Sequence, residues 1–344
     1  MTGLVSALQI GAKLGNGHFG EVHLGEDPVH GPVAVKIYRA LPGEYPATWN
    51  ARKASLLAEG VNLRKAKHRH VVEVHHIVSS QTDDAVHLVM ELCEQGSLQG
   101  RYEAGPLPTR DVHAIATDIC HGLGALHDRE MLHRDIKPGN LLMDKNGVAK
   151  LGDFGLVTDD IILGYAGAAG YIDHLAPEVF ETGQTSSRSD FWALGMTLYR
   201  LLHGDAWYRS SPAPRYLVRD LGYADRLIWL PHISSRWRRL IRSMLNDSPH
   251  ARLATHGKVL DALARMAGDI CWDFETNGVA SKWRRRAKDR VIDVVFEPSG
   301  KKWVWTAISH PAGRGVKRTI ASSGGPVNRS TAEKSLRAFF EDCL

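Results

Sequence analysis

Long apolar runs and cysteine are both scarce in this sequence. No run of 18 consecutive apolar residues occurs, so we expect no membrane-spanning helix. The first residues, MTGLVSALQIGAKLG, lack the basic region and long apolar core of a signal peptide, which predicts a cytoplasmic protein. Only 4 cysteines occur in 344 residues, none of them in a CxxC pair, which argues against a disulfide framework and against a clustered zinc site.

Charge is unevenly distributed along the chain. The whole sequence carries a formal net charge of +5, but residues 275–344 alone hold 14 Lys and Arg against 7 Asp and Glu. The residues before them are therefore close to neutral. We expect a neutral globular body followed by a basic module.

The first 94 residues have the pattern of a small sheet with one helix. Residues 8–38 alternate apolar and polar positions around glycines, which predicts three antiparallel strands. Helical spacing follows at 48–66, and two more strands are expected at 71–78 and 85–92. This is a β-rich lobe.

Residues 95–270 are mostly helical in pattern. Long amphipathic stretches occur at 109–127 and 189–202, and helical signals return at 235–246 and 256–267. Short strand-like pieces, LLMD and AKLGD, lie between the first two helices. The α+β pattern therefore predicts two lobes, with boundaries near 1–94 and 95–270.

The end of the chain predicts a separate module. Residues 271–290 look like a basic linker, with the charged run ASKWRRRAKDR as a connector. Three strand-like runs follow, RVIDVVFEP, KKWVWTAIS and VKRTIASS, and STAEKSLRAFFEDCL closes the chain as an amphipathic helix. A Ser or Thr can cap this helix, with Glu333 placed for a capping box. We expect residues 291–344 to form a βββα module.

A glycine-rich turn lies between the first two predicted strands. Without a Cβ, Gly15, Gly17 and Gly20 let backbone amides approach a phosphate. A plain hairpin turn explains the same pattern. A dinucleotide-binding fold would place a helix directly after these glycines, but EVHLGE continues as a strand, so the better functional interpretation is a flap over phosphates.

A lysine occupies an inward-looking position on the next strand. Lys36 follows Val and Ala in VAVK, and a buried ammonium needs an acidic side chain or an anionic ligand. Glu59, on the helix that follows, is the candidate partner.

Three polar residues come from one short loop, HRDIKPGN. Asp135, Lys137 and Asn140 follow each other at intervals of two and three residues, so a rigid loop can deliver their heads to one phosphoryl group. With GNGHFGEV, VAVK, the helical Glu59, DFG and APE, this loop completes a set that resembles, in order, the eukaryotic-type (Hanks-type) serine/threonine protein kinases. The resemblance covers about residues 8–267 and implies a bilobal protein kinase-like fold.

The resemblance implies ATP and Mg²⁺ as cofactors. Lys36 would hold the α and β phosphates and Glu59 would fix Lys36, while Asp153 and Asn140 would bind the metal. Asp135 would accept the substrate hydroxyl proton. Lys137 would neutralise the transferring phosphate, and its position two residues after Asp135 resembles the serine/threonine branch.

The resemblance also implies an adenine pocket and one structural support. Met90 would be the gatekeeper, and Glu91 to Cys93 would form the hinge. Asp190 would brace the catalytic loop. The other nucleotide contacts would come from strands and loops on either side of the ring: Leu14, Gly15, Gly17, Gly20, Val22, Ala34 and Leu142.

The segment before APE is unusual for this family. Residues 156–178 contain no serine and only Thr158 as threonine. An ungapped alignment puts Tyr171 and His174 where GTxxY has its hydroxyls, and an alternative register treats GAAGYID as a variant followed by three extra residues. Both registers lose the usual threonine. Our hypothesis is that the apolar run 161–163 holds this loop, with phosphorylation at Thr158 as the other possibility.

The basic tail has two interpretations. Cations and tryptophans such as Trp283, Trp303 and Trp305 are suited to nucleic acid, whereas a solvated basic face over a tryptophan core explains the same residues. Alternation places Trp303 and Trp305 on one face, either in the core or as a docking surface for the last helix. A tethered module can recruit substrate, bind nucleic acid or dock on the lobes.

The sequence leaves three functions open. An active serine/threonine protein kinase is the first, since every position for ATP, metal and proton handling is filled. A kinase-shaped scaffold or binding protein is the second, and a kinase acting on a non-protein substrate is the third. Composition suggests a bacterial or phage-related protein.

Overall fold

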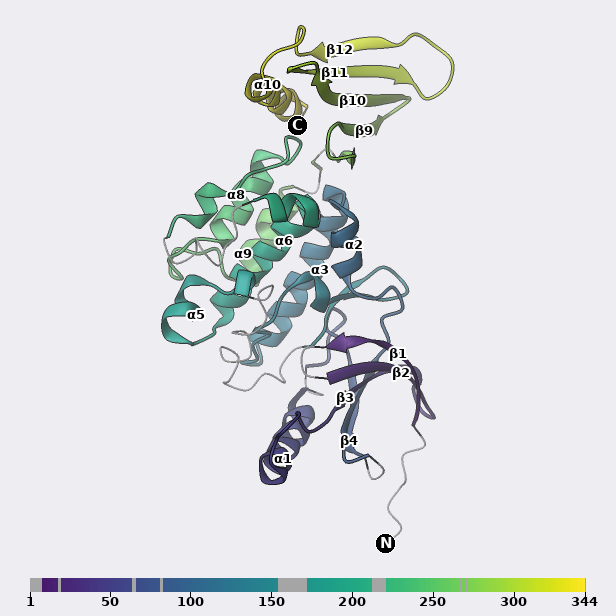
Figure 1. Cartoon of the computed structure of the whole chain (residues 1–344), viewed down its shortest axis with the longest axis vertical. Coiled ribbons are helices and arrows are strands. Elements are labelled where there is room, and N and C mark those ends of the chain that lie inside the picture. The colour runs from purple at the N-terminus through teal and green to yellow at the C-terminus, as the bar shows by residue number, and fades with distance from the viewer. Residues whose placement is uncertain are drawn as a thin grey trace. The chain divides into compact units, whose positions relative to one another are not determined.

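The computed structural model describes residues 8–17, 20–63, 66–80, 83–153, 172–211, 221–266, 268–269 and 271–343. Figure 1 shows the whole chain, which divides into two compact units that we describe separately. One unit contains residues 1–99 and 117–193, and the other contains residues 100–116 and 194–344.

A five-stranded antiparallel sheet with one helix forms the start of the first unit. The sheet order is β1-β2-β3-β5-β4, and the helix α1 follows β3 along the chain. This confirms the predicted β-rich lobe. The elements are β1 (Gln9–Gly17), β2 (Gly20–Asp27), β3 (Gly31–Tyr38), α1 (Pro46–Leu63), β4 (Val74–Ser79) and β5 (Val86–Glu91).

Apolar residues of the central strands form the core of this lobe. Val33, Val35 and Ile37 of β3 pack with Ala85 and Val89 at β5. These residue types favour strands because branched side chains pack well on a pleated surface.

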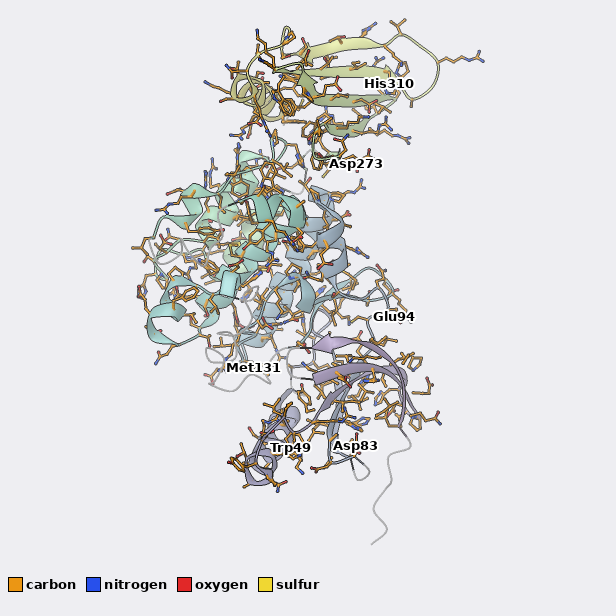
Figure 2. The ribbon with its side chains drawn as sticks, viewed as in Figure 1. Trp49, Asp83, Glu94, Met131, Asp273 and His310 are labelled. Atoms are coloured by element: carbon orange, nitrogen blue, oxygen red, sulfur yellow. The ribbon has the colours of Figure 1, made fainter. Side chains whose placement is uncertain are left out.

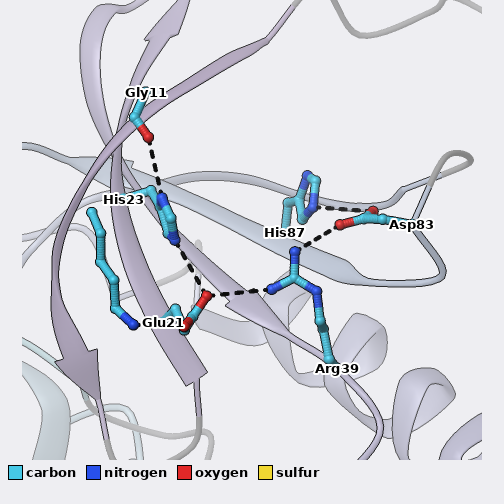
Figure 3. Close-up of polar contacts among 7 residues, drawn as sticks. Gly11, Glu21, His23, Arg39, Asp83 and His87 are labelled. Atoms are coloured by element: carbon cyan, nitrogen blue, oxygen red, sulfur yellow. Dashed lines mark hydrogen bonds and ion pairs between the residues drawn. The ribbon is translucent and has the colours of Figure 1, made fainter.

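Polar contacts at the surface tie the strands and turns of the same lobe together. In Figure 3, Nδ1 of His23 lies 3.2 Å from the carbonyl oxygen of Gly11, and Arg39 reaches Glu21 at 3.7 Å and Asp83 at 2.9 Å. Figure 2 shows Asp83 and Trp49, the latter on α1. Exposed ion pairs such as these contribute little one by one, so the apolar core carries most of the stability.

The rest of the first unit supports a loop and a short hairpin. The end of α3 (Thr109–His127) leads into the loop and into η1 (Pro138–Asn140), and β6 (Leu141–Met143) then pairs with β7 (Ala149–Leu151). The strand-like pieces LLMD and AKLGD are thereby confirmed. Two further short helices are η2 (Ile172–His174) and α5 (Pro177–Thr182).

The second unit is helical where the sequence predicts helices. The helices include α2 (Leu98–Ala104), the start of α3, α6 (Ser187–Ser210), η4 (Tyr223–Arg226), α8 (Ser235–Met244) and α9 (His256–Ala264). The backbone of α6 is kinked at Gly204, where φ is 75°. In the described part of the chain, no helix is long and apolar enough to cross a membrane.

The C-terminal module has five strands instead of three. Its sheet order is β12-β11-β10-β9-β8, followed by one helix. The bounds are β8 (Asp273–Thr276), β9 (Ser281–Ala287), β10 (Arg290–Ser299), β11 (Lys302–Pro311), β12 (Arg318–Ser322) and α10 (Arg329–Asp342). Asp273 on β8 and His310 on β11 are labelled in Figure 2.

The predicted connector is wrong, because its charged run forms β9. Trp283 is 2% exposed, whereas Lys282 and Arg284 on either side of it are exposed. The charged side chains therefore follow the period of two of a strand with one wet face. Because most residues of this run are charged, the alternation was not apparent in the sequence.

Aromatic residues fill the core of the module. Trp305 is 3% exposed, its Nε1 donates to Oγ of Ser335 at 2.8 Å, and its ring lies 5.4 Å from that of Phe339 on α10. Because Trp283 and Trp305 are buried, neither is available to stack on a base. The interpretation as core residues is confirmed for Trp283 and Trp305, whereas Trp303 is only partly buried against the same core.

The last helix is capped by a residue other than the predicted Ser or Thr. Asn328 is the N-cap, and its Oδ1 accepts the backbone amide of Thr331 at 2.8 Å. Glu333 bonds Arg329 at 2.8 Å instead of closing a capping box. Asn is as good a cap as Ser, and the helix begins earlier than the sequence pattern suggested.

Candidate active site

A buried carboxylate holds the loop between α3 and β6. Asp190 is 1% exposed and accepts the backbone amides of His133 at 2.9 Å and Arg134 at 2.8 Å. Arg134 has a φ of 69°, a conformation that costs free energy for a residue with a Cβ. The predicted bracing role of Asp190 thus corresponds to direct hydrogen bonds to the loop backbone.

Two histidines that the sequence analysis did not single out support the same loop. Nε2 of His127 lies 2.8 Å from Oδ2 of Asp190. His133 is fully buried, and its Nε2 donates to the carbonyl oxygen of Gly152 at 3.0 Å. Burial lowers the pKa of His133, so the imidazole is neutral near pH 7. The signal for His133 was its place directly before Arg134 in the loop motif.

The structure brings together the three polar heads of the loop. Nζ of Lys137 and Nδ2 of Asn140 both donate to Oδ2 of Asp135 at 2.7 Å, and Nδ2 of Asn140 also lies 2.8 Å from the Asp135 carbonyl oxygen. Burial lowers the pKa of Lys137, while the carboxylate of Asp135 opposes this shift. One carboxylate oxygen is therefore held between a cation and an amide.

Lys36 of β3 pairs with Asp153. The Nζ of Lys36 lies 2.8 Å from Oδ1 of Asp153, and Lys36 is 3% exposed. Burial opposes the charge of Lys36, but its neighbours Tyr38 and Asp153 raise its pKa. Burial also opposes the charge of Asp153, yet Lys36 and then Lys137 lower its pKa. Both groups are therefore charged at neutral pH.

This ion pair was not predicted from the sequence. Lys36 and Asp153 are 117 positions apart, and the local pattern named Glu59 as the lysine's partner. Glu59 belongs to α1, but its side chain lies outside the described residues, so its contact with Lys36 stays a prediction.

The residues expected around an adenine ring come from three strands and the segment after β5. Ala34 of β3 is opposite Met90 of β5, and both are buried. Cys93 is also buried, and burial raises the pKa of its thiol to about 12. Leu142 lies on β6 and forms an isolated β-bridge with Ser97, which follows the predicted hinge along the chain.

The glycine-rich turn joins β1 to β2. Gly15 is opposite Val22, and Val22 is opposite Lys36, so the turn and the lysine lie on adjacent strands. A Cβ on Gly20 would lie 2.4 Å from the carbonyl oxygen of Ile37, whereas one on Gly15 would meet nothing within 4 Å. Packing therefore requires Gly20. Leu14 is 53% exposed, and Gly17 pairs with Gly20 at the turn.

The segment from Phe154 to Tyr171 lies outside the described residues. The hypotheses on Thr158 and on the apolar run 161–163 concern that segment and stay predictions. The structure resumes at η2, where His174 is buried.

Comparison with known proteins identifies a protein kinase domain at residues 8–262. Cell division control protein 7 of Schizosaccharomyces pombe is 27% identical over 86% of this chain and 27% of that protein. CBL-interacting serine/threonine-protein kinase 21 of Arabidopsis thaliana is 28% identical over 72% of this chain and 59% of its own length. Tyrosine-protein kinase TXK of Mus musculus is 27% identical over 76% of this chain and 49% of that protein.

This chain corresponds to only part of each relative. The chain spans between about a quarter and three fifths of their lengths. All three are eukaryotic, so they give no support to the bacterial source that composition suggested. Residues beyond 262, including the C-terminal module, lie outside the family match.

Proposed function

Because a protein kinase domain covers more than half of the chain, the chain belongs to the protein kinase family, and we propose that it is a serine/threonine kinase. It would transfer the γ phosphate of Mg-ATP to a hydroxyl of a protein. The observation that carries this proposal is the shared hydrogen bonding of Lys137 and Asn140 to one oxygen of Asp135. Lys137 favours the serine/threonine branch.

Asp135 would handle the proton of the attacking hydroxyl. Its Oδ2 is fixed by two donors, so its Oδ1 is the atom that would accept the proton as the hydroxyl oxygen bonds to phosphorus and the bond to ADP breaks. Lys137 would stabilise negative charge on the transferring group.

The oxygen atoms of two residues fit a magnesium ion. Nδ2 of Asn140 donates to Asp135, which would leave Oδ1 of the same amide for a metal ion. Asp153 uses one oxygen for Lys36, so its other carboxylate oxygen can bind a hard cation. Mg²⁺ keeps water and phosphate ligands, so two protein oxygens suffice, and the bound ion would neutralise charge on the phosphates.

The predicted nucleotide contacts form the rest of the proposal. Lys36 would bind the α and β phosphates, and Glu59 would orient it. The glycine turn, with Gly15, Gly17 and Gly20, would cover the phosphates. The adenine ring would lie among apolar side chains and receive hydrogen bonds from the hinge backbone: Leu14, Val22, Ala34, Met90, Glu91, Cys93 and Leu142.

The test is phosphotransfer by the purified full chain with labelled ATP, Mg²⁺ and a generic protein substrate. We expect phosphoserine or phosphothreonine that disappears in Asp135→Asn but persists in Asp128→Asn, whose side chain is exposed. Lys36→Met should abolish transfer as well. Transfer that survives Asp135→Asn would refute the proposed base, and ATP binding without transfer would indicate a scaffold.

A further inference from the structure

A cleft of about 890 Å³ lies in the second unit, and none of the described residues that line it is a candidate active-site residue. Its wall comes from three parts of the chain: η4 and the segment after it, α8 with the residues that follow, and α10 of the C-terminal module. Only Arg337 represents α10. The module therefore contributes a residue to a cleft on the kinase domain.

Direct contacts hold α10 beside α8. Glu341 of α10 forms an ion pair with Arg238 of α8 and lies 3.4 Å from the backbone amide of Ser235. In the same joint, Trp283 donates its Nε1 to Nδ1 of His232 at 2.9 Å, and both side chains are buried. Arg337 is one helical turn before Glu341, so the same face of α10 reaches the cleft.

Positive charge dominates the cleft wall. Ser235, Arg238, Arg239 and Arg242 follow the spacing of one face of α8, and Arg337 adds a fourth guanidinium. We call these four arginines the arginine cluster. Arg238 has Glu341 as its partner, whereas Arg239 and Arg337 have no carboxylate partner among the residues that the structure describes.

The arginines are close enough to repel one another. Burial lowers the pKa of Arg238, Glu341 opposes that shift, and Arg337 and Arg242 add to it. In addition, Nε of Arg337 is buried without a hydrogen-bond partner within the described chain. Crowded guanidiniums and an unsatisfied donor cost free energy, which an anion bound in the cleft would recover.

The part of the wall that follows η4 suits a peptide. Leu227, Ile228 and Trp229 line the cleft, and Nε1 of Trp229 is buried with no partner in the described residues. Asp225 and Asp247 also line it. Two carboxylates disfavour a continuous polyanion such as nucleic acid, but they can pair with basic side chains beside a single phosphate.

We propose that the arginine cluster binds a phosphoserine or phosphothreonine segment of a protein. A phosphate monoester carries nearly two charges and three acceptor oxygens, which convergent guanidiniums recognise with charge-assisted hydrogen bonds. The flanking residues of the segment would occupy the wall formed by Leu227, Ile228 and Trp229. This proposal does not depend on phosphotransfer by the chain, because binding is tested without ATP.

The experiment measures binding of the full chain to degenerate decapeptide libraries with a central phosphoserine or phosphothreonine, beside the same libraries without phosphate. Phosphorylated peptides should bind, and Arg337→Gln and Arg242→Gln should each weaken binding at least tenfold. Arg226→Gln removes the same charge from an exposed position outside the cleft wall and should change binding less than twofold. Arg337→Lys, which keeps the charge, should be intermediate.

Hydrogen exchange of the complex locates the bound peptide even where a variant folds poorly. Added phosphopeptide should slow amide exchange in α8 and α10. Protection at the catalytic loop instead would mean product binding and would overturn the proposal. Equal binding of unphosphorylated peptides, equal competition by inorganic phosphate or by a single-stranded 20-mer DNA, or no binding at all would also overturn it.

Discussion

The backbone amide of Arg134 donates to Oδ1 of Asp190 at 2.8 Å. This bond connects the start of α6 to the loop between α3 and β6 and holds Arg134 at a φ of 69°. The next residue along the chain is Asp135. A strained backbone persists only where its surroundings fix it, so the geometry of the proposed base depends on a carboxylate that does not itself touch it.

Replacing Asp190 with asparagine should therefore impair both stability and transfer. The amide nitrogen of the new side chain is a donor, and it would face a backbone N–H whose hydrogen bond the carboxylate now accepts. We expect a loss of about 2 kcal/mol in the free energy of unfolding and about a hundredfold in kcat, with a smaller change in the KM for ATP. Urea unfolding and steady-state kinetics measure these effects, and exposed Asp128→Asn is the control. An unchanged kcat would show that the loop keeps its geometry without this carboxylate.

Two glycines of the same turn should respond differently to alanine. Gly20→Ala places a Cβ 2.4 Å from the carbonyl oxygen of Ile37, so we expect a loss of about 1–3 kcal/mol in unfolding free energy. Gly15→Ala meets no atom within 4 Å and should change stability by less than about 0.5 kcal/mol. If the turn covers phosphates, Gly15→Ala should nevertheless weaken ATP binding measured by calorimetry. Equal ATP affinity would support the plain-hairpin interpretation.

Local patterns predicted the two lobes and most of the loop residues because the motifs are short and contiguous. Asp135, Lys137 and Asn140 come from one loop, so their spacing along the chain already determines their proximity. The Lys36 to Asp153 pair was not predicted, since it depends on tertiary structure across 117 positions.

In the C-terminal module, the local sequence pattern failed to predict a strand. In the run KWRRRA, charge on the exposed face outweighed the single inward Trp283, so a strand was taken for a linker. Alternation along β11, in contrast, placed Trp305 on the same face as Trp303 but left open whether that face was core or a docking surface, and the structure buries Trp305. Alternation is informative when both faces contribute residues of clearly different polarity.

The cap of α10 offers a direct test of one correction. Asn328→Ala removes the acceptor of the Thr331 amide and should cost about 1 kcal/mol, with faster hydrogen exchange in the first turn of the helix. Ser330→Ala should change stability by less than about 0.5 kcal/mol. A larger loss of stability in Ser330→Ala than in Asn328→Ala would mean that a serine caps the helix, as the sequence predicted.

The hydrogen bond between His232 and Trp283 should be sensitive to acid. Burial lowers the pKa of His232 to about 3, and the same holds for His203, which also disfavours the charged form of His232. In the unfolded chain the imidazole pKa is about 6.5. The folded state requires the neutral form, so its stability is complete above about pH 6.5 and declines as the pH falls toward 3.

Replacing His232 with asparagine removes this titration but keeps an acceptor for Nε1 of Trp283, because Oδ1 of asparagine can occupy the place of Nδ1. By linkage, the variant should lose about 2 kcal/mol less unfolding free energy than the parent between pH 7 and pH 5. Urea unfolding at both pH values measures this difference. His250→Asn, at an exposed position, serves as the control and should follow the parent. If the His232→Asn variant and the parent lose equal unfolding free energy between pH 7 and pH 5, protonation of this imidazole does not limit the stability of the protein in acid.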